Sequence, residues 1–167
     1  MVRRLLRASC RTDLSVSSCG VQVVPGALPG APALTVAREH GVELERQRAV
    51  QVARHGLAAA DLVVTMTEAQ RSHVCRVGTG LVTKTFTMVE LCRLLSGVRA
   101  VDLEDWRQVA RTAHLARPRA MAPQQTEDVP DPIGLSIDEH RLVAAGLEVL
   151  CQQLVARLQP DRPAAPG

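Results

Sequence analysis

The chain is 167 residues long, 46% of its residues are apolar, and its formal net charge is +3. This length suits a single domain that can bury a core without disulfides or metals. The positive charge is scattered as arginines among acidic residues, with Lys84 as the only lysine, so nucleic-acid binding is not expected. No apolar run is long enough to span a bilayer, so no membrane partner is expected either.

The five cysteines are widely spaced and include no C-x-x-C pair (Cys10, Cys19, Cys75, Cys92 and Cys151). This pattern argues against a disulfide framework or a zinc site and indicates a reducing compartment. The histidines show no metal spacing, and the basic N-terminus lacks the apolar stretch of a signal peptide. We therefore expect a cytoplasmic protein without metal or cofactor, and the sequence does not determine its oligomeric state.

Short helices and strands alternate in the first half of the chain. The first ten residues have the composition of a helix with no N-cap before it, and residues 14–18 alternate as a short strand does. Pro32 and Gly41 suit the first turn and the C-terminal end of a helix that lies between them.

The clearest strand–helix unit lies near the middle of the chain. Residues 61–66 contain an apolar run, which is typical of a parallel strand that is covered on both faces. Residues 67–70 have capping-box spacing and predict a helix directly after the strand. The unit then repeats, with a strand at residues 84–88 and a second capping box at residues 87–90.

The last third of the chain is predicted to contain two helices and a loop. Asp102 can cap a helix that runs through about Ala113, and the composition of residues 114–130 predicts a long loop. Residues 136–139 form a third capping box. The helix that follows carries one apolar stripe, formed by Val143, Leu147, Cys151, Leu154 and Leu158.

The order of these elements predicts the fold class and the domain organisation. Alternating strands and helices are typical of a three-layer α/β domain with a parallel sheet and right-handed crossovers. We expect one domain over residues 1–159 and a disordered tail over residues 160–167.

Five motifs with compatible spacing resemble one known family. They are Val16-Ser-Ser-Cys-Gly20, the stretch from Gly41 to Arg48, Ala59-Ala-Asp-Leu-Val-Val-Thr-Met66, Thr85-Phe-Thr-Met-Val-Glu90-Leu and Asp128-Val-Pro-Asp131-Pro. Together they make the chain similar to the low-molecular-weight protein tyrosine phosphatases from about residue 4 to residue 158. The resemblance implies the Rossmann-like, phosphotyrosine phosphatase I type of α/β fold.

The resemblance also implies a catalytic mechanism. In the family, a C-x-x-x-x-x-R-S loop binds phosphate through its backbone N–H groups and lowers the pKa of the thiol, so that the cysteine attacks as a thiolate. Asp131 matches the aspartate that protonates the leaving oxygen as general acid; its other interpretation is an Asx-Pro turn. Ser18 matches the serine that helps to fix the phosphate loop, and an ordinary serine at a strand end fits equally well.

Two residues depart from the family pattern near these positions. Gln47 stands where the family often has histidine, and Ile133 stands where an aromatic side chain commonly flanks the substrate ring. Both departures bear on specificity for aromatic phosphates.

The strand and the phosphate loop of the family would precede Met1. Residues 1–6 resemble the helix that follows the loop, so the central first strand of the sheet is predicted to be missing from these 167 residues, and an upstream start is expected. Cys151 and Arg157 match C-x-x-x-x-x-R formally. Their segment has no glycine and is predicted as helix, where a spacing of six residues rotates Arg157 away from Cys151. No phosphate-binding or metal-binding residue is therefore assigned.

Two functions remain open. The first is a phosphatase of phosphotyrosine proteins or small phosphomonoesters, inactive as the 167-residue chain because the loop is absent. The alternative is a non-catalytic pseudophosphatase that binds a protein through a surface around residues 100–130. Arsenate reduction is a third possibility, but it needs the same loop cysteine.

Overall fold

The computed structural model describes residues 1–8, 14–98, 105–119 and 126–157. The elements in this part of the chain are, in order, α1 (Val2–Ala8), α2 (Ala31–Glu39), α3 (Arg54–Ala59), β1 (Val63–Thr65), α4 (Glu68–Val77), the 3₁₀ turn η1 (Thr79–Leu81), β2 (Thr85–Thr87), α5 (Met88–Leu94), α6 (Trp106–Ala116), the 3₁₀ turn η3 (Arg117–Arg119) and α7 (Ile137–Ala156). Among the described residues, no helix combines the length and the apolar character that a membrane crossing needs.

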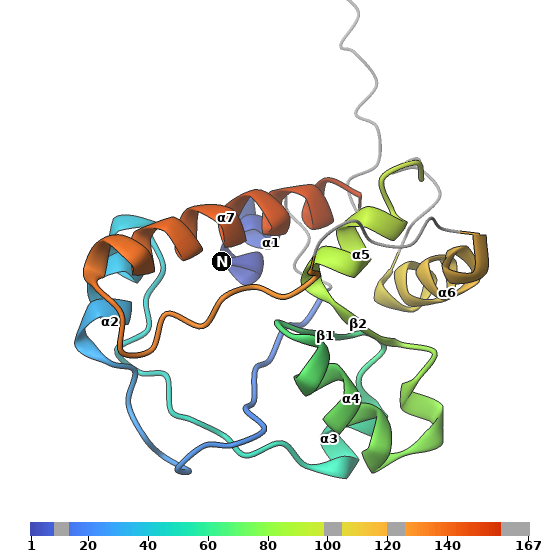
Figure 1. Ribbon diagram of the computed structural model, residues 1–167, viewed down its shortest axis with the longest axis horizontal. Helices are drawn as coiled ribbons and strands as arrows, with labels where there is room; N and C mark the ends of the chain where they lie inside the picture. Colours follow the sequence, from blue (N-terminus) through green and yellow to red (C-terminus); the bar gives the residue numbers. More distant parts are fainter. Residues whose placement is uncertain (9–13, 99–104, 120–125, 158–167) are drawn as a thin grey trace, which may run out of the picture.

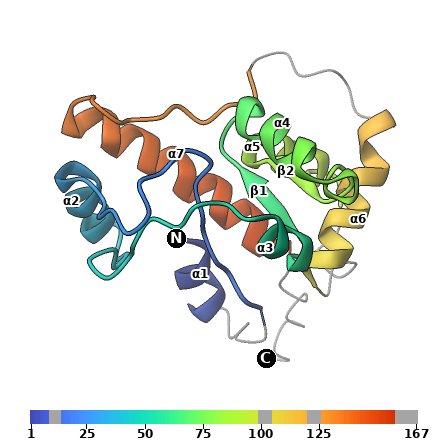
Figure 2. The same ribbon diagram turned by 90° about the horizontal axis from the view of Figure 1, so that it is seen from below.

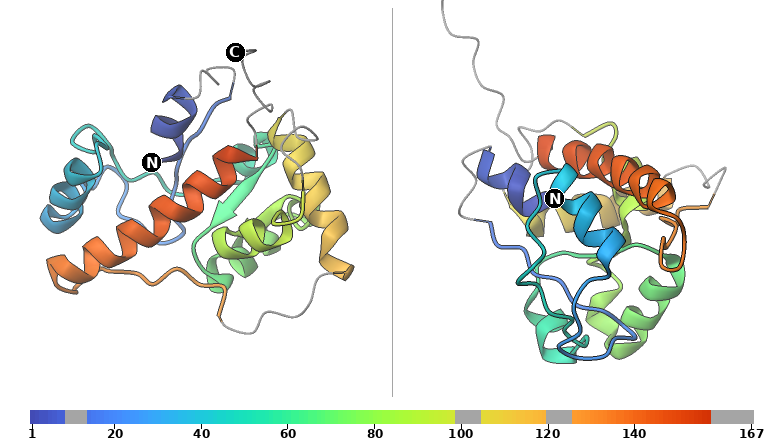
Figure 3. Two further views of the ribbon diagram at one scale, coloured as in Figure 1. Left: turned by 90° about the horizontal axis from the view of Figure 1, so that it is seen from above. Right: turned by 90° about the vertical axis from the view of Figure 1, so that its left-hand side faces the viewer.

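The two strands form a small parallel sheet in the middle of the molecule (Figure 1). Val63 pairs with Thr85, and Thr65 pairs with Thr87. The helices α3 and α4 lie on one side of this sheet, and α5 and α7 lie on the other (Figure 1). Both α1 and α2 lie alongside α7 (Figures 2 and 3). The predicted three-layer α/β class with a parallel sheet is therefore confirmed.

A separate apolar cluster packs against each face of the sheet. Val63 packs against a small cluster that includes Leu57 of α3 and Val74 of α4. Val64 packs against the larger cluster, which α1, α5, α6, α7 and β2 build around the fully buried Phe86. Because successive residues of a strand point to opposite faces, a strand between two clusters is apolar on both sides, and this explains the apolar run in the sequence.

Several helix ends lie where the sequence predicts them. Pro32 is in the first turn of α2, and Gly41 follows the helix with φ of 64°, a left-handed conformation that favours glycine. Thr67 and Ser136 make the reciprocal bonds of a capping box at the starts of α4 and α7. The partners of these helix-end residues lie within a few positions in the sequence, so the sequence alone predicts the ends of a helix that forms.

The predictions for the region after β2 need correction. Thr87 caps α5, but the Glu90 side chain does not complete the box, because it binds Arg117. Asp105 caps α6, whereas Asp102 lies outside the described residues. The predicted loop at residues 114–130 is wrong at its start, since α6 continues to Ala116.

Residues 14–18 do not form a strand, contrary to the prediction. In the described part of the chain they join no sheet ladder. An isolated parallel bridge just after them joins Gly20 to Gln51. A strand needs a neighbour for its backbone hydrogen bonds, and alternating side chains alone do not supply one. Leu14 and Val16 are partly buried and pack against the larger cluster.

Two further predictions stay predictions. One is that the central first strand of the sheet is missing from these 167 residues, and the other is the single domain over residues 1–159. The predicted tail at residues 160–167 lies outside the described residues.

Candidate active site

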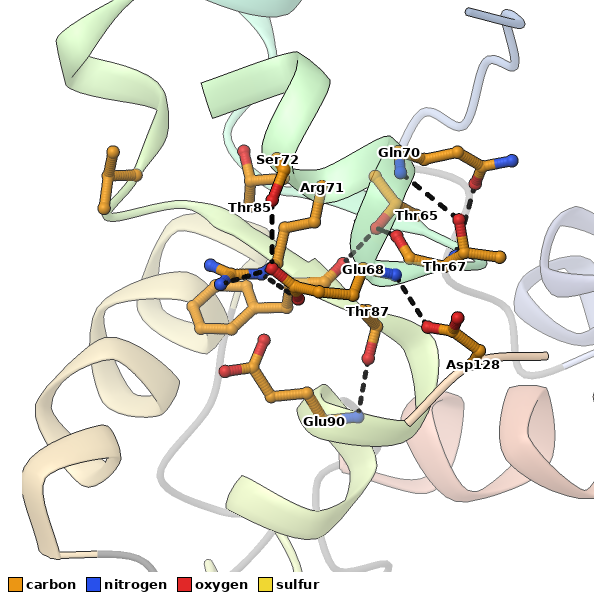
Figure 4. Close-up of polar contacts among 12 residues, drawn as sticks. Thr65, Thr67, Glu68, Gln70, Arg71, Ser72, Thr85, Thr87, Glu90 and Asp128 are labelled. Carbon is orange, nitrogen blue, oxygen red and sulfur yellow. Dashed lines mark hydrogen bonds and ion pairs between the residues drawn. The ribbon is translucent and has the colours of Figure 1, made fainter. Parts of the chain in front are cut away.

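The carboxyl ends of β1 and β2 lie at one edge of the sheet, where α4 and α5 begin (Figure 4). Thr67 Oγ1 accepts a hydrogen bond from the backbone N–H of Gln70 at 3.2 Å, and Gln70 Oε1 accepts from the N–H of Met66 at 2.9 Å. Thr87 Oγ1 accepts from the N–H of Glu90 at 3.1 Å. Ligands of parallel α/β sheets bind outside this edge, so we take it as the candidate site.

Two bidentate ion pairs lie beside this edge. Arg71 donates from Nε and Nη2 to the Glu68 carboxylate at 2.6 and 2.9 Å. This contact lowers the pKa of Glu68 and raises the pKa of Arg71. Figure 4 shows that Glu68 and Glu90 come from the starts of α4 and α5.

The second pair, Arg117 with Glu90, is the more buried one. Arg117 donates from Nε and Nη2 to the two carboxylate oxygens of Glu90 at 2.9 and 3.0 Å, and the side chains are 19% and 11% exposed. The guanidinium carbon lies 4.1 Å from the centroid of the Phe86 ring, and Nη2 also donates to the carbonyl of Thr85 at 2.7 Å. Arg117 therefore ties the end of α6 to β2 and α5.

Asp131 lies in the segment that leads to α7. Its side chain is exposed, and its Oδ1 accepts a hydrogen bond from the N–H of Ile133 at 3.0 Å, which is an Asx turn. Gly134 follows with φ of 82°, and the N–H of Leu135 donates to the carbonyl of Pro132 at 3.0 Å. The turn is compatible with both interpretations of Asp131, so its general-acid role stays a prediction.

Three consecutive residues before Pro130 hold this segment against the candidate site. Arg93 Nε of α5 donates to Glu127 Oε1 at 2.6 Å. The N–H of Glu68, the first residue of α4, donates to Asp128 Oδ1 at 2.7 Å (Figure 4). The N–H of Val129 donates to the carbonyl of Met66, the residue directly after β1, at 2.8 Å. The Asp-Val-Pro-Asp-Pro motif is thereby placed at the carboxyl edge of the sheet.

The structure brings together Ser18 and Gln47, two residues that the sequence comparison singled out. Gln47 Nε2 donates to Ser18 Oγ at 3.2 Å, and both side chains are exposed. Among the described residues, neither side chain hydrogen-bonds to Asp131. The supporting role of Ser18 stays a prediction.

The four described cysteines are free thiols: Cys75, Cys92 and Cys151 lie within α4, α5 and α7, and Cys19 is exposed before Gly20. Burial raises the pKa of Cys92 to about 11 and raises the pKa of Cys151, so both thiols stay protonated at neutral pH. Cys151 lies inside α7, and Arg157 at the end of this helix donates to the carbonyls of Val98 and Ser96 at 2.7 and 3.1 Å. The formal C-x-x-x-x-x-R match is therefore part of a helix in which Cys151 is buried, whereas Cys10 lies outside the described residues.

No group of His, Cys, Asp or Glu side chains within the described ranges could hold a metal ion. Sequence reasoning missed Arg117 and the anchoring contacts of Glu127 and Asp128. The partners of Arg117 and Glu127 lie 27 and 34 residues away, and no local pattern encodes such a pair. Asp128 carried a partial signal, because it opens the motif that contains Asp131.

Comparison with known proteins identifies the family. A sequence model of the family of low molecular weight phosphotyrosine protein phosphatases matches residues 1–113. The chain belongs to this family. A comparison with curated proteins finds no match.

Solved structures of phosphatases share the fold. The YwlE arginine phosphatase from Geobacillus stearothermophilus is 23% identical with a TM-score of 0.68, and the alignment covers 95% of this chain and 82% of that one. The low molecular weight protein tyrosine phosphatase from T. tengcongensis is 21% identical with a TM-score of 0.70, covering 94% and 86%. The tyrosine phosphatase amsI from Erwinia amylovora is 22% identical with a TM-score of 0.65, covering 92% and 80%.

Proposed function

We propose that this phosphatase-family chain provides the scaffold and the general acid for phosphomonoester hydrolysis, with Asp131 as the acid. The observation that carries the proposal is the placement of the Asp-Val-Pro-Asp-Pro segment at the carboxyl edge of the sheet, through Asp128 and Val129. Asp131 is exposed beside this anchored stretch. A carboxyl group in that place can protonate a leaving oxygen and then help to activate water.

The covalent step needs a thiolate beside phosphate-binding N–H groups. Three of the four described cysteines lie within helices, and burial raises the pKa values of Cys92 and Cys151. We therefore propose that the 167-residue chain by itself does not hydrolyse phosphomonoesters.

The substrate class is proposed from the family and the solved relatives. Family membership favours a phosphorylated protein side chain, phosphotyrosine above all, or a small phosphomonoester. One solved relative is named an arginine phosphatase, so phosphoarginine belongs among the substrates to assay. We also propose a cytoplasmic location, which the free thiols of the described cysteines support.

A loop graft tests the role of Asp131. In a chimera, the family's N-terminal strand and C-x-x-x-x-x-R-S loop precede Met1, and hydrolysis of an aryl phosphate is measured. We expect turnover, and we expect Asp131→Asn to lower kcat by about 100-fold, in the range of general acid catalysis. Asparagine can still accept the Ile133 hydrogen bond, so this variant removes the proton and keeps the turn.

Asp138→Asn is the matched control, because Asp138 is an exposed aspartate of α7 that pairs with Arg141. It should leave kcat unchanged. Equal turnover of the unmodified chimera and the Asp131→Asn variant would show that Asp131 is not the acid.

The alternative is a non-catalytic pseudophosphatase that binds a partner protein near residues 100–130. One observation favours it: Leu115 of α6 is 57% exposed within this stretch. A chimera that folds but shows no turnover, with or without Asp131, would favour this alternative.

A further inference from the structure

Asp128 makes the contact that joins the segment of Asp131 to α4. Glu68 is the first residue of α4, and its N–H has no acceptor inside the helix. Asp128 Oδ1 accepts this N–H at 2.7 Å. A carboxylate at a helix N-terminus forms a charge-assisted hydrogen bond and also interacts favourably with the helix dipole.

The local charges favour this contact. The Glu68 side chain is close in sequence to the bound N–H, but both of its carboxylate oxygens accept from Arg71 at 2.6 and 2.9 Å. The Glu68 carboxylate is thereby paired with a guanidinium, as the neighbouring Glu127 carboxylate is with Arg93. Asp128 can bind the helix without facing an unpaired carboxylate.

The chain between Asp128 and Asp131 is short and stiff. Val129 is 7% exposed in the larger cluster and donates to the carbonyl of Met66 at 2.8 Å. Proline follows at positions 130 and 132, and each ring fixes the φ of its residue. Only Val129 and Pro130 separate Asp128 from Asp131, so the two aspartates have little freedom to move relative to each other.

We propose that Asp128 is a positioning residue for Asp131: its hydrogen bond to the N-terminus of α4 fixes the location of the exposed Asp131 carboxylate at the carboxyl edge of the sheet. The functional meaning of this contact rests on the proposed role of Asp131 as general acid. The contact itself can be tested without turnover.

Hydrogen exchange on the full 167-residue chain, measured by NMR, tests the proposal. The N–H of Glu68 reports the contact, and the N–H of Ile133 reports the turn at Asp131. In Asp128→Ala, both amides should exchange about tenfold faster or more, as expected for loss of a hydrogen bond to a charged group. The carbon shift of the Asp131 carboxyl group should change as well.

Asp128→Asn is the conservative variant, because its amide oxygen can accept the same N–H. It should return both amides and the Asp131 shift close to their original values. Asp138→Ala, an exposed aspartate beyond Asp131, should leave them unchanged. If Asp128→Ala speeds exchange at Glu68 but leaves Ile133 and the Asp131 shift as they were, Asp128 only caps α4 and the proposal is wrong.

A second variant covers the case in which Asp128→Ala does not fold. Asp128→Glu keeps the charge but moves the carboxylate outward by one methylene, so it should disturb the Ile133 amide more than Asp128→Asn does. Equal behaviour of the Glu and Asn variants would overturn the proposal. Because no turnover is measured, a failed graft experiment would leave these results unaffected.

Discussion

Residues 61–98 and residues 14–53 differ in how they are built. The first region consists of strand–helix units around residues that are at most 1% exposed, such as Phe86, Leu91 and Leu95. The second contains one helix, α2, with Val36 as its buried residue, and several large apolar side chains in it are exposed: Val24, Leu28 and Val50. Apolar runs and capping boxes correctly predict structure where each element packs on the next, whereas the alternating pattern of residues 14–18 alone does not predict a strand.

The largest expected difference between the regions is in core packing. Phe86→Ala removes a fully buried ring and should lower the free energy of unfolding by about 3–5 kcal/mol. Leu28→Ala, in the second region, removes a side chain that is 61% exposed and should cost under about 0.5 kcal/mol. Urea midpoints of the two variants measure the contrast. Similar losses would show that the second region has a core of its own.

The Arg117–Glu90 pair should give the next largest effect. Arg117→Ala leaves the Glu90 carboxylate buried without its partner, and about 3 kcal/mol of stability should be lost. Arg107→Ala is the matched control, because the Arg107–Asp61 pair is 81% and 46% exposed and is expected to contribute about 0–1 kcal/mol. A loss in Arg117→Ala no larger than in the control would mean that water reaches the Glu90 carboxylate.

The sequence predicts most of the features that depend on neighbouring residues, and few of the contacts between residues far apart in the chain. The capping boxes at Thr67 and Ser136 and the two strands follow from spacing alone. The partner of Arg117 lies 27 residues away, so no pattern could show that Glu90 would bind Arg117 instead of completing its box. The strand expected at residues 14–18 is not formed, because alternation of side chains does not specify which segment a strand pairs with.

In the candidate site, too, the sequence predicts the local features and misses the long-range contacts. Asp131 is found from its motif, and its turn with Ile133 follows from the Asp-Pro sequence. The contact of Asp128 with α4 joins residues 60 positions apart, and only the fold brings them together.

The smallest expected effect is the loss of stability at acid pH that comes from the Glu68 carboxylate. The hydrogen bond from Arg71 lowers the pKa of Glu68 from its ordinary 4.5. A lowered pKa in the folded state means that this contact stabilises the protein above pH 4.5 and that its contribution is lost as the pH falls further. Because the Glu68 side chain is 54% exposed, this ion pair should contribute at most about 0.5 kcal/mol to the free energy of unfolding.

Comparison of the unmodified chain with Glu68→Gln measures this effect. The difference between their urea midpoints should be present at neutral pH and should vanish well below pH 4.5. A difference that persists in acid would show that Glu68 acts through packing rather than through its charge.

The central proposal is that this phosphatase-family chain supplies the scaffold and the general acid Asp131, and that none of the four described cysteines is the nucleophile. Hydrolysis of an aryl phosphate by the purified 167-residue chain tests it most directly. We predict a rate that matches the uncatalysed reaction and is unaffected when any of the five cysteines is replaced by serine. Turnover that one such substitution abolishes would contradict the account and would identify the nucleophile.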